Sequence, residues 1–180
     1  MSAFGTLVRQ SKEPFEQALI VCFYDFTSFT KWAEQRPASE VFDCLDAYFE
    51  FTGGFINDQG GLFIKAIGDA GLIIFPGDTS LELSNALNAM EALQSQANTW
   101  LQSRKMDSRV VVQMALGNVA CGSVGAPDDK RFDVYGNTVN QAALLKTNKF
   151  AITTEFYNHC SEETKPRFEK IGQCGWELKS

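Results

Sequence analysis

Residues 60–75 read GGLFIKAIGDAGLIIF, and this stretch decides the fold. Two apolar runs, residues 62–67 and 70–75, flank the pair Gly68-Asp69, which suits a two-residue turn. The glycine pair at the start of the stretch is expected to end the helix before it. The pattern therefore predicts a tight β-hairpin, which belongs to an antiparallel sheet.

Upstream of the hairpin, residues 18–24 (ALIVCFY) form a continuous apolar run. Such a run, rich in branched and aromatic side chains, predicts a buried strand. We expect the strand to stop at Asp25, and Thr27 or Ser28 to cap a short helix after it. Residues 1–17 are interpreted as a loose N-terminal lead-in, so the folded domain is predicted to span residues 18–180.

Two longer helices are predicted on either side of the hairpin, because apolar residues recur at three- and four-residue spacing. The first opens at Pro37 and Ser39 and ends at the glycine pair. Its predicted inward face comprises Val41, Phe42, Leu45, Tyr48, Phe49, Thr52 and Ile56. The second spans residues 81–103, and its predicted inward face comprises Leu83, Leu87, Met90, Leu93, Ala97 and Leu101.

The C-terminal half continues with alternating strands and helices. Residues 110–116 and 119–124 predict a strand pair around Gly117-Asn118, and a polar loop then leads to a short strand ending at Tyr135. The remaining predicted elements are a helix over 136–145, a strand over 150–152, a helix capped by Thr153 or Thr154 that runs to Cys160, and a strand pair over 168–179. This order predicts an α+β domain with helices on one face of a mainly antiparallel sheet.

Composition excludes several classes of function. The formal net charge of −6 argues against non-specific nucleic-acid binding, which needs a basic surface. No stretch approaches the roughly 20 apolar residues of a membrane span. The five cysteines include no CxxC pair, as in a reduced cytoplasmic protein. The single histidine, His159, cannot build a multi-histidine metal centre, and we interpret it as structural.

Two aspartates are predicted at the ends of strands. Asp25 follows the buried strand and Asp69 occupies the hairpin turn, so both lie at a rim of the sheet. Converging carboxylates there are suited to two Mg²⁺ or Mn²⁺ ions, which prefer oxygen ligands. The amides of residues 26–29 open a helix, where free N–H groups attract phosphate. From these residues alone, a turn role for Asp69 and a helix-start role for Asp25 stay open.

Four segments, in this order and spacing, resemble the catalytic (cyclase homology) domain of class III adenylyl and guanylyl cyclases. They are FYDFTSFT at 23–30, GGLFIKAIGDAGLIIF at 60–75, ALGNVACGSVG at 115–125 and RFDVYGNTVNQAA at 131–143. The resemblance runs from Ala18 to Ile171. It implies a ferredoxin-like core and conversion of a nucleoside triphosphate to its 3′,5′-cyclic monophosphate and pyrophosphate. It also implies a homodimer, paired head to tail, with composite sites that each hold two Mg²⁺ or Mn²⁺ ions.

The resemblance assigns roles to residues of both subunits. One subunit would bind the metals through Asp25, Asp69 and the backbone of Phe26, and the phosphates through the amides of Phe26, Thr27, Ser28 and Phe29. The other would read the base through Lys65 and Asp133. Adenine offers an acceptor at N1 for an ammonium and an exocyclic N–H for a carboxylate, so this pair favours ATP. Asn140 matches the asparagine that supports the transition state.

Three departures from the family pattern affect phosphate binding. Leu144 stands where active members carry an arginine, and losing such a donor costs about 10²–10³ in rate. Lys146 is expected on another helix face, so it should not substitute. A basic residue of the family aligns with Val111, whereas Arg109 lies two residues away on the same strand face. ELKS at 177–180 resembles the start of the family's lysine-glycine segment, so either Lys179 is the triphosphate lysine or that residue is missing.

Three functions therefore stay open. The first is an active homodimeric adenylyl cyclase, supported by the metal and base positions. The second is a pyrimidine cyclase that uses CTP or UTP, as in stand-alone bacterial relatives involved in phage defence, with Tyr24 or Tyr135 reshaping the base pocket. The third is a nucleotide-binding module without turnover, which Leu144 favours.

Overall fold

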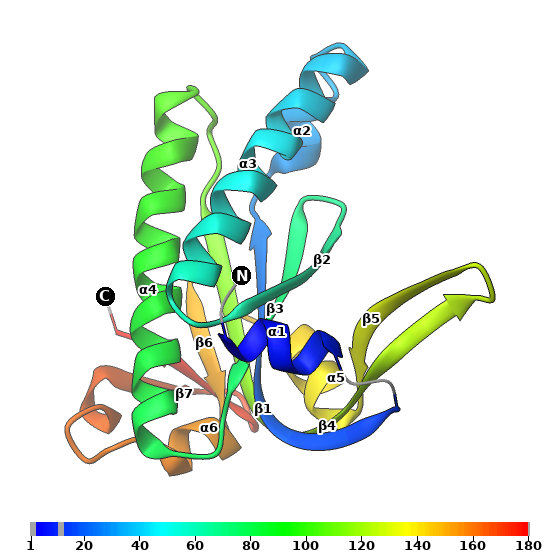
Figure 1. The fold of residues 1–180 in the computed structure, drawn as a ribbon. Coiled ribbons are helices and arrows are strands. Elements are labelled where there is room, and N and C mark those ends of the chain that lie inside the picture. The colour runs from blue at the N-terminus through cyan, green and yellow to red at the C-terminus, as the bar shows by residue number, and fades with distance from the viewer. Residues whose placement is uncertain (1–2, 11–12, 180) are drawn as a thin grey trace.

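The strands β1 (Phe15–Phe26) and β4 (Val110–Ala126) form the centre of an eight-stranded sheet in the computed structural model, which describes residues 3–10 and 13–179 (Figure 1). The strand order is β2-β3-β1-β4-β6-β8-β7, and β5 pairs with β4 alone. All described pairs are antiparallel except β4–β6. The other strands are β2 (Leu62–Ile67), β3 (Ala70–Pro76), β5 (Asp129–Tyr135), β6 (Phe150–Thr153), β7 (Phe168–Ile171) and β8 (Gly175–Leu178).

The first half of the chain has ferredoxin-like topology. Between β1 and β2 lie the helices α2 (Phe29–Ala33) and α3 (Ala38–Asp58), and α4 (Ser80–Ser103) connects β3 to β4. This βαββαβ order with the spatial order β2-β3-β1-β4 is the split βαβ arrangement. The predicted fold class, an α+β domain with a ferredoxin-like core, is therefore confirmed.

Helices cover both faces of the sheet, so the prediction that they share one face is wrong. One face of β1, with Ile20 and Cys22, packs in a single core cluster with residues of α3, α4 and α6 (Thr154–His159). The other face, with Leu19 and Val21, packs with residues of α1 (Ala3–Gln10) and α5 (Asn137–Leu144). Because β1 is apolar on both faces, each face needs a cover.

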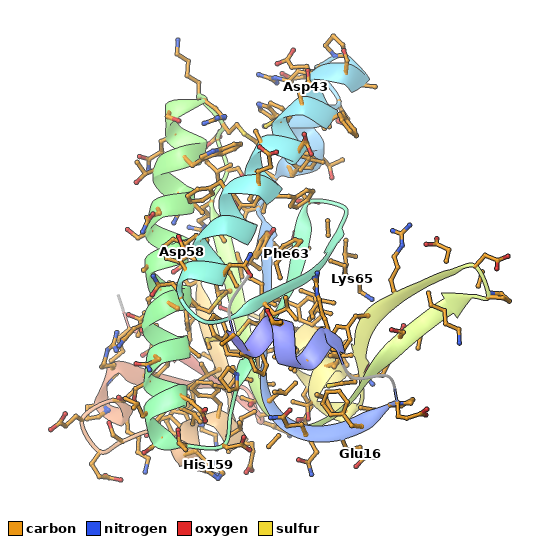
Figure 2. All side chains as sticks on the ribbon, viewed as in Figure 1. Glu16, Asp43, Asp58, Phe63, Lys65 and His159 are labelled. Carbon is orange, nitrogen blue, oxygen red and sulfur yellow. The ribbon has the colours of Figure 1, made fainter. Side chains whose placement is uncertain are left out.

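The second long helix is the best predicted element. α4 begins with a capping box in which Thr79 and Glu82 bind each other's backbone N–H groups. All six residues of its predicted inward face are buried. In α3, by contrast, the buried residues Tyr48, Thr52 and Ile56 lie in the C-terminal half. Phe42 is 69% exposed, and its predicted burial is wrong because this end of α3, marked by Asp43 in Figure 2, extends beyond the sheet.

β4 is one continuous strand, so the predicted turn at Gly117-Asn118 is wrong. Its first twelve residues pair with the whole of β1, and its last seven pair with β5. Gly117 instead allows α5 to approach, because a Cβ atom there would lie 2.6 Å from Thr138 Oγ1. That hydroxyl donates to the Asn118 carbonyl at 2.9 Å. The glycine therefore marks a close contact between helix and strand.

Part of the predicted loose lead-in is regular structure. Residues 3–10 form α1, and its Val8 is buried in the second core cluster. β1 begins at Phe15, three residues before the predicted start. Within the described chain, no helix has the length and apolar character needed to cross a membrane.

Candidate functional site

The two aspartates singled out in the sequence lie side by side at one rim of the sheet. Asp25 is the penultimate residue of β1, Asp69 lies in the β2–β3 turn, and β1 pairs directly with β3. Burial, followed by the neighbouring Asp25 carboxylate, raises the pKa of the Asp69 carboxyl to about 6, although N–H groups of Asp69 and Phe26 oppose the rise. Asp25 Oδ1 accepts a hydrogen bond from the Phe26 N–H at 2.8 Å.

This pair of carboxylates fits a hard divalent cation. Two acidic groups in contact, one of them half-buried, repel each other unless a positive charge lies between them. Mg²⁺ is commonly bound by one or two carboxylates and completed by water and substrate phosphates. In residues 3–10 and 13–179 no group of three or more His, Cys, Asp or Glu side chains is placed to hold a metal ion.

The predicted phosphate-binding segment is anchored to the residue that precedes β4. The Thr27 N–H donates to the Arg109 carbonyl at 2.9 Å, and the Phe26 N–H is bound to Asp25, so two of the four predicted amides are already engaged. For Ser28 and Phe29, the structure of the described residues contains no such bond. The predicted helix cap is also wrong: Ser28 occupies the N-cap of α2 with φ 62° and makes no side-chain cap.

Arg109 lies at the same rim as the aspartates. It directly precedes β4. Val111, two residues further along the chain, pairs opposite Asp25 of β1. The Arg109 side chain is exposed, whereas Val111 is buried. The structure thus brings this predicted phosphate ligand close to the aspartates.

Lys65 and Asp133, the predicted base-reading pair, are in direct contact. Lys65 on the edge strand β2 donates through Nζ to Asp133 Oδ2 on β5, and Figure 2 shows Lys65 pointing into the gap between these strands. Asp133 is 6% exposed, and its Oδ1 accepts the Val134 N–H at 2.9 Å. The Tyr135 hydroxyl donates to Oδ2, also at 2.9 Å. The sequence suggested Tyr135 only as a residue that reshapes the pocket. Its spacing of two from Asp133 was the available signal for this contact.

Asn140 and Leu144 line a cavity of about 850 Å³ beside α5. Its other walls come from the β6–α6 junction and the turn between β7 and β8. Lys146 lines it as well, so its predicted placement on a different helix face is wrong. α5 ends at Leu144 and Leu145 is extended, with ψ 108°, so helical periodicity does not apply to Lys146.

The structure does not bring Lys179 to the aspartates of the same chain. Its Nζ donates to the Pro166 carbonyl at 2.7 Å, and its backbone N–H donates to the Arg167 carbonyl. Lys179 follows β8, which β6 and β4 separate from β1. Tyr24 is fully buried in edge contact with Tyr48, so its side chain belongs to the core.

The sequence matches a known family over most of its length. The family described as adenylate and guanylate cyclase catalytic domain matches residues 11–173. The uncharacterized protein Mb1354c of Mycobacterium bovis is 32% identical over 130 residues, which make up 72% of this chain and 23% of that protein. The uncharacterized protein Rv1318c of Mycobacterium tuberculosis is 27% identical over 161 residues, or 85% of this chain and 29% of that protein. The chain therefore spans about a quarter of the length of these curated relatives.

Solved cyclase structures share the fold at low identity. The adenylyl cyclase CyaB from P. aeruginosa superposes with a TM-score of 0.76 at 18% identity, covering 93% of this chain and 96% of that one. The guanylate cyclase domain of RhGC from Catenaria anguillulae, solved in complex with GTP, gives a TM-score of 0.78 at 16% identity, covering 92% and 98%. Adenylyl and guanylyl cyclases match equally well, so this likeness shows the fold and does not distinguish ATP from GTP as the substrate. Because the family match extends over nearly the whole sequence, this chain belongs to the adenylate and guanylate cyclase catalytic domain family.

Proposed function

We propose that this domain converts ATP to 3′,5′-cyclic AMP and pyrophosphate, with two Mg²⁺ or Mn²⁺ ions per site, at sites shared by two identical subunits paired head to tail. The observation that carries the proposal is the contact between Asp25 and Asp69 at the rim where β1 and the β2–β3 turn meet. Two adjacent carboxylates, one of them half-buried, are a costly arrangement without a cation. Their position in a cyclase-family fold supports a metal-binding role.

In this mechanism the chain binds and orients the nucleotide. Asp25 and Asp69, with the Phe26 carbonyl, would hold the ions, which supply activation of the 3′-hydroxyl and neutralise phosphate charge. The amides of Ser28 and Phe29, with Arg109, would bind phosphate oxygens. The 3′-hydroxyl would lose its proton to solvent, and the 3′-oxygen would form its bond to the α-phosphorus in line with the bond to pyrophosphate, which breaks. Asn140 of the cavity beside α5 would support this transition state.

The base would be read by Lys65 and Asp133 of the other subunit. An ammonium donates to adenine N1, and a carboxylate accepts from the exocyclic amino group. Cytosine presents the same neighbouring acceptor and amino group, so this pair supports CTP as the substrate of the pyrimidine alternative. Guanine and uracil present an N–H where Lys65 needs an acceptor.

A second function is favoured by Leu144, which is 77% exposed at the cavity that contains Asn140. An apolar side chain there cannot donate to a phosphate. A domain that binds a nucleotide but turns it over slowly or not at all would have this feature. Lys146 lines the same cavity, and its positive charge supports retained activity despite Leu144.

The test is to incubate the protein with ATP, GTP, CTP or UTP and Mn²⁺, and to identify the products by mass spectrometry. The proposal predicts cyclic AMP, which Asp25→Ala and Asp69→Ala should each abolish. Asp43→Ala, on the exposed end of α3, is the matched acidic control and should retain activity. Formation of cyclic CMP would support the proposed mechanism but show that the site reads cytosine and not adenine. Nucleotide binding without any product would establish the second function, and full activity in both site variants would refute the metal assignment.

A further inference from the structure

Tyr135 contacts both groups that are proposed to read the base. Its hydroxyl lies 2.9 Å from Asp133 Oδ2, and the Lys65 ammonium lies 5.8 Å from the centre of its ring. Asp133 and Tyr135 are two residues apart on β5, so they project from the same side of the strand. Val134 between them is buried in the core cluster of the opposite side. The backbone of β5 therefore positions the Tyr135 hydroxyl beside Asp133.

The acceptor capacity of Asp133 is nearly filled. An ionised carboxylate offers about four acceptor positions on its two oxygens. Oδ2 accepts from Lys65 and from Tyr135, and Oδ1 accepts from the Val134 N–H. About one position therefore remains, on Oδ1. Because both oxygens are held, the carboxylate also cannot rotate to present a different edge.

One remaining acceptor suits some bases and not others. Adenine and cytosine need a single acceptor for their amino group, beside a donor for the ring nitrogen. Guanine presents two neighbouring N–H donors, N1–H and the 2-amino group, which need two acceptors. A hydroxyl bound to Oδ2 removes the second acceptor. The bond to Asp133 also raises the pKa of the Tyr135 hydroxyl, so this group remains a donor at neutral pH.

Resting on the proposed nucleotide-binding function, we propose that Tyr135 is a positioning residue that sets base specificity. Its hydroxyl occupies Asp133 Oδ2 and restricts the site to bases that pair an amino group with a ring acceptor. Tyr135 is 52% exposed, so a substitution there need not disturb the core. Tyr135→Phe keeps the ring beside Lys65 and removes only the hydroxyl.

The experiment measures binding, which does not depend on turnover. Analogues of ATP and GTP with a methylene group between the α- and β-phosphates cannot release pyrophosphate. Their dissociation constants are measured by calorimetry with Mn²⁺ for the wild type, Tyr135→Phe and the control Tyr157→Phe. Tyr157 stacks on Trp176 in a different part of the fold. We expect the preference for the ATP analogue to fall by about ten- to a hundredfold in Tyr135→Phe, since a hydrogen bond to a charged group contributes about that factor. The control should keep the wild-type ratio.

Each outcome separates this inference from the proposed catalysis. An unchanged ratio in Tyr135→Phe overturns the role of Tyr135, even if the wild type makes cyclic AMP. Suppose that the wild type prefers the ATP analogue but forms no product from ATP, and that Tyr135→Phe weakens this preference. This result overturns the catalysis and supports the inference. A wild type that binds neither these two analogues nor the corresponding CTP analogue, or that prefers the GTP analogue, overturns both. A merely structural role for Tyr135 would weaken both analogues equally, and this too would overturn the inference.

Discussion

Thr27 and Arg109 exchange two hydrogen bonds at the rim where β1 ends and β4 begins. The Thr27 N–H donates to the Arg109 carbonyl at 2.9 Å, and the Arg109 N–H donates to Thr27 Oγ1 at 3.1 Å. The Ser108 hydroxyl also donates to the Thr27 carbonyl. The next residue, Ser28, has left-handed backbone angles of 62° and 17°, which are unfavourable for a residue with a Cβ atom. Bonds from Ser108 and Arg109, just before β4, therefore hold the segment that is proposed to bind phosphate.

We predict that Thr27→Val, which removes only the Oγ1 acceptor, loosens this segment. The free energy of unfolding should fall by about 1 kcal/mol, the contribution of one hydrogen bond. The KM for the nucleotide should rise, because the amides of Ser28 and Phe29 are then less well oriented. Thr99→Val is the control, since Thr99 is exposed on α4 and bonds only within its helix. A variant that loses stability while its KM stays unchanged would show that this contact does not organise phosphate binding.

Asp69→Asn is predicted to stabilise the metal-free protein. The raised pKa of Asp69, which comes from burial and from Asp25, means that its charge opposes folding at pH 8. Water screens this half-buried group, so we expect a gain of about 1 kcal/mol in chemical denaturation without metal. Adding Mn²⁺ should stabilise the wild type more than the variant, since a ligand of the folded state raises its stability. Asp43→Asn should behave as the wild type does. Equal stabilisation of all three proteins by Mn²⁺ would contradict binding at Asp69.

The end of α4 offers a stability test without a link to the site. Lys105 has φ 53°, and the N–H groups of Lys105 and Met106 donate to Gln102 and Leu101 in the pattern of a Schellman motif. Glycine is preferred at this left-handed position, so Lys105→Gly should raise the unfolding free energy by about 0.5–1 kcal/mol. The melting temperature should rise by roughly 2 °C, with activity unchanged. Ser103→Gly, in the last turn of the helix, should have the opposite effect on stability.

Local pattern was sufficient for the elements whose signals lie within a few residues. The β2–β3 hairpin has its turn residues between two apolar runs, and α4 has a regular apolar face. Longer-range pairing decided the elements that were predicted wrongly. Gly117-Asn118 resembles a turn locally, but β1 is long enough to pair with the strand on both sides of it. The coverage of both sheet faces by helices likewise depends on which segments dock there.

The same distinction applies to the candidate site. Asp25 and Asp69 could be placed at one rim because each ends or joins a strand. Lys65 and Asp133 are 68 residues apart, and only the family resemblance suggested that they act together. No sequence pattern predicts the hydrogen bonds that Ser108 and Arg109 make with Thr27, because these bonds depend on the path of the loop before β4. Lys146 was misplaced because its position depends on where α5 ends.

Leu144→Arg is predicted to increase the rate of cyclisation at least about tenfold, because one preorganised phosphate donor is worth about 10²–10³. Leu144 is largely exposed, so an arginine there should not destabilise the fold. Single-turnover rates with ATP and Mn²⁺ measure the effect. Lys146→Ala is the companion variant. If Leu144→Arg brings no gain and Lys146→Ala removes the activity, Lys146 already supplies the missing charge.

Mixing two variants tests whether the sites are shared between subunits. Asp25→Ala removes a proposed metal ligand, and Lys65→Ala removes a proposed base contact. If one subunit supplies the metals and the other the base, a mixed dimer has one site with both defects and one intact site. Random exchange then restores about a quarter of the wild-type sites, so at low ATP the mixture should exceed the mean of the two separate activities. If all groups act within one chain, every site in the mixture carries a defect, and the activity should equal that mean. Mixing wild type with Asp25→Ala under the same conditions leaves half of the wild-type sites with or without exchange, so this mixture controls for effects of mixing itself.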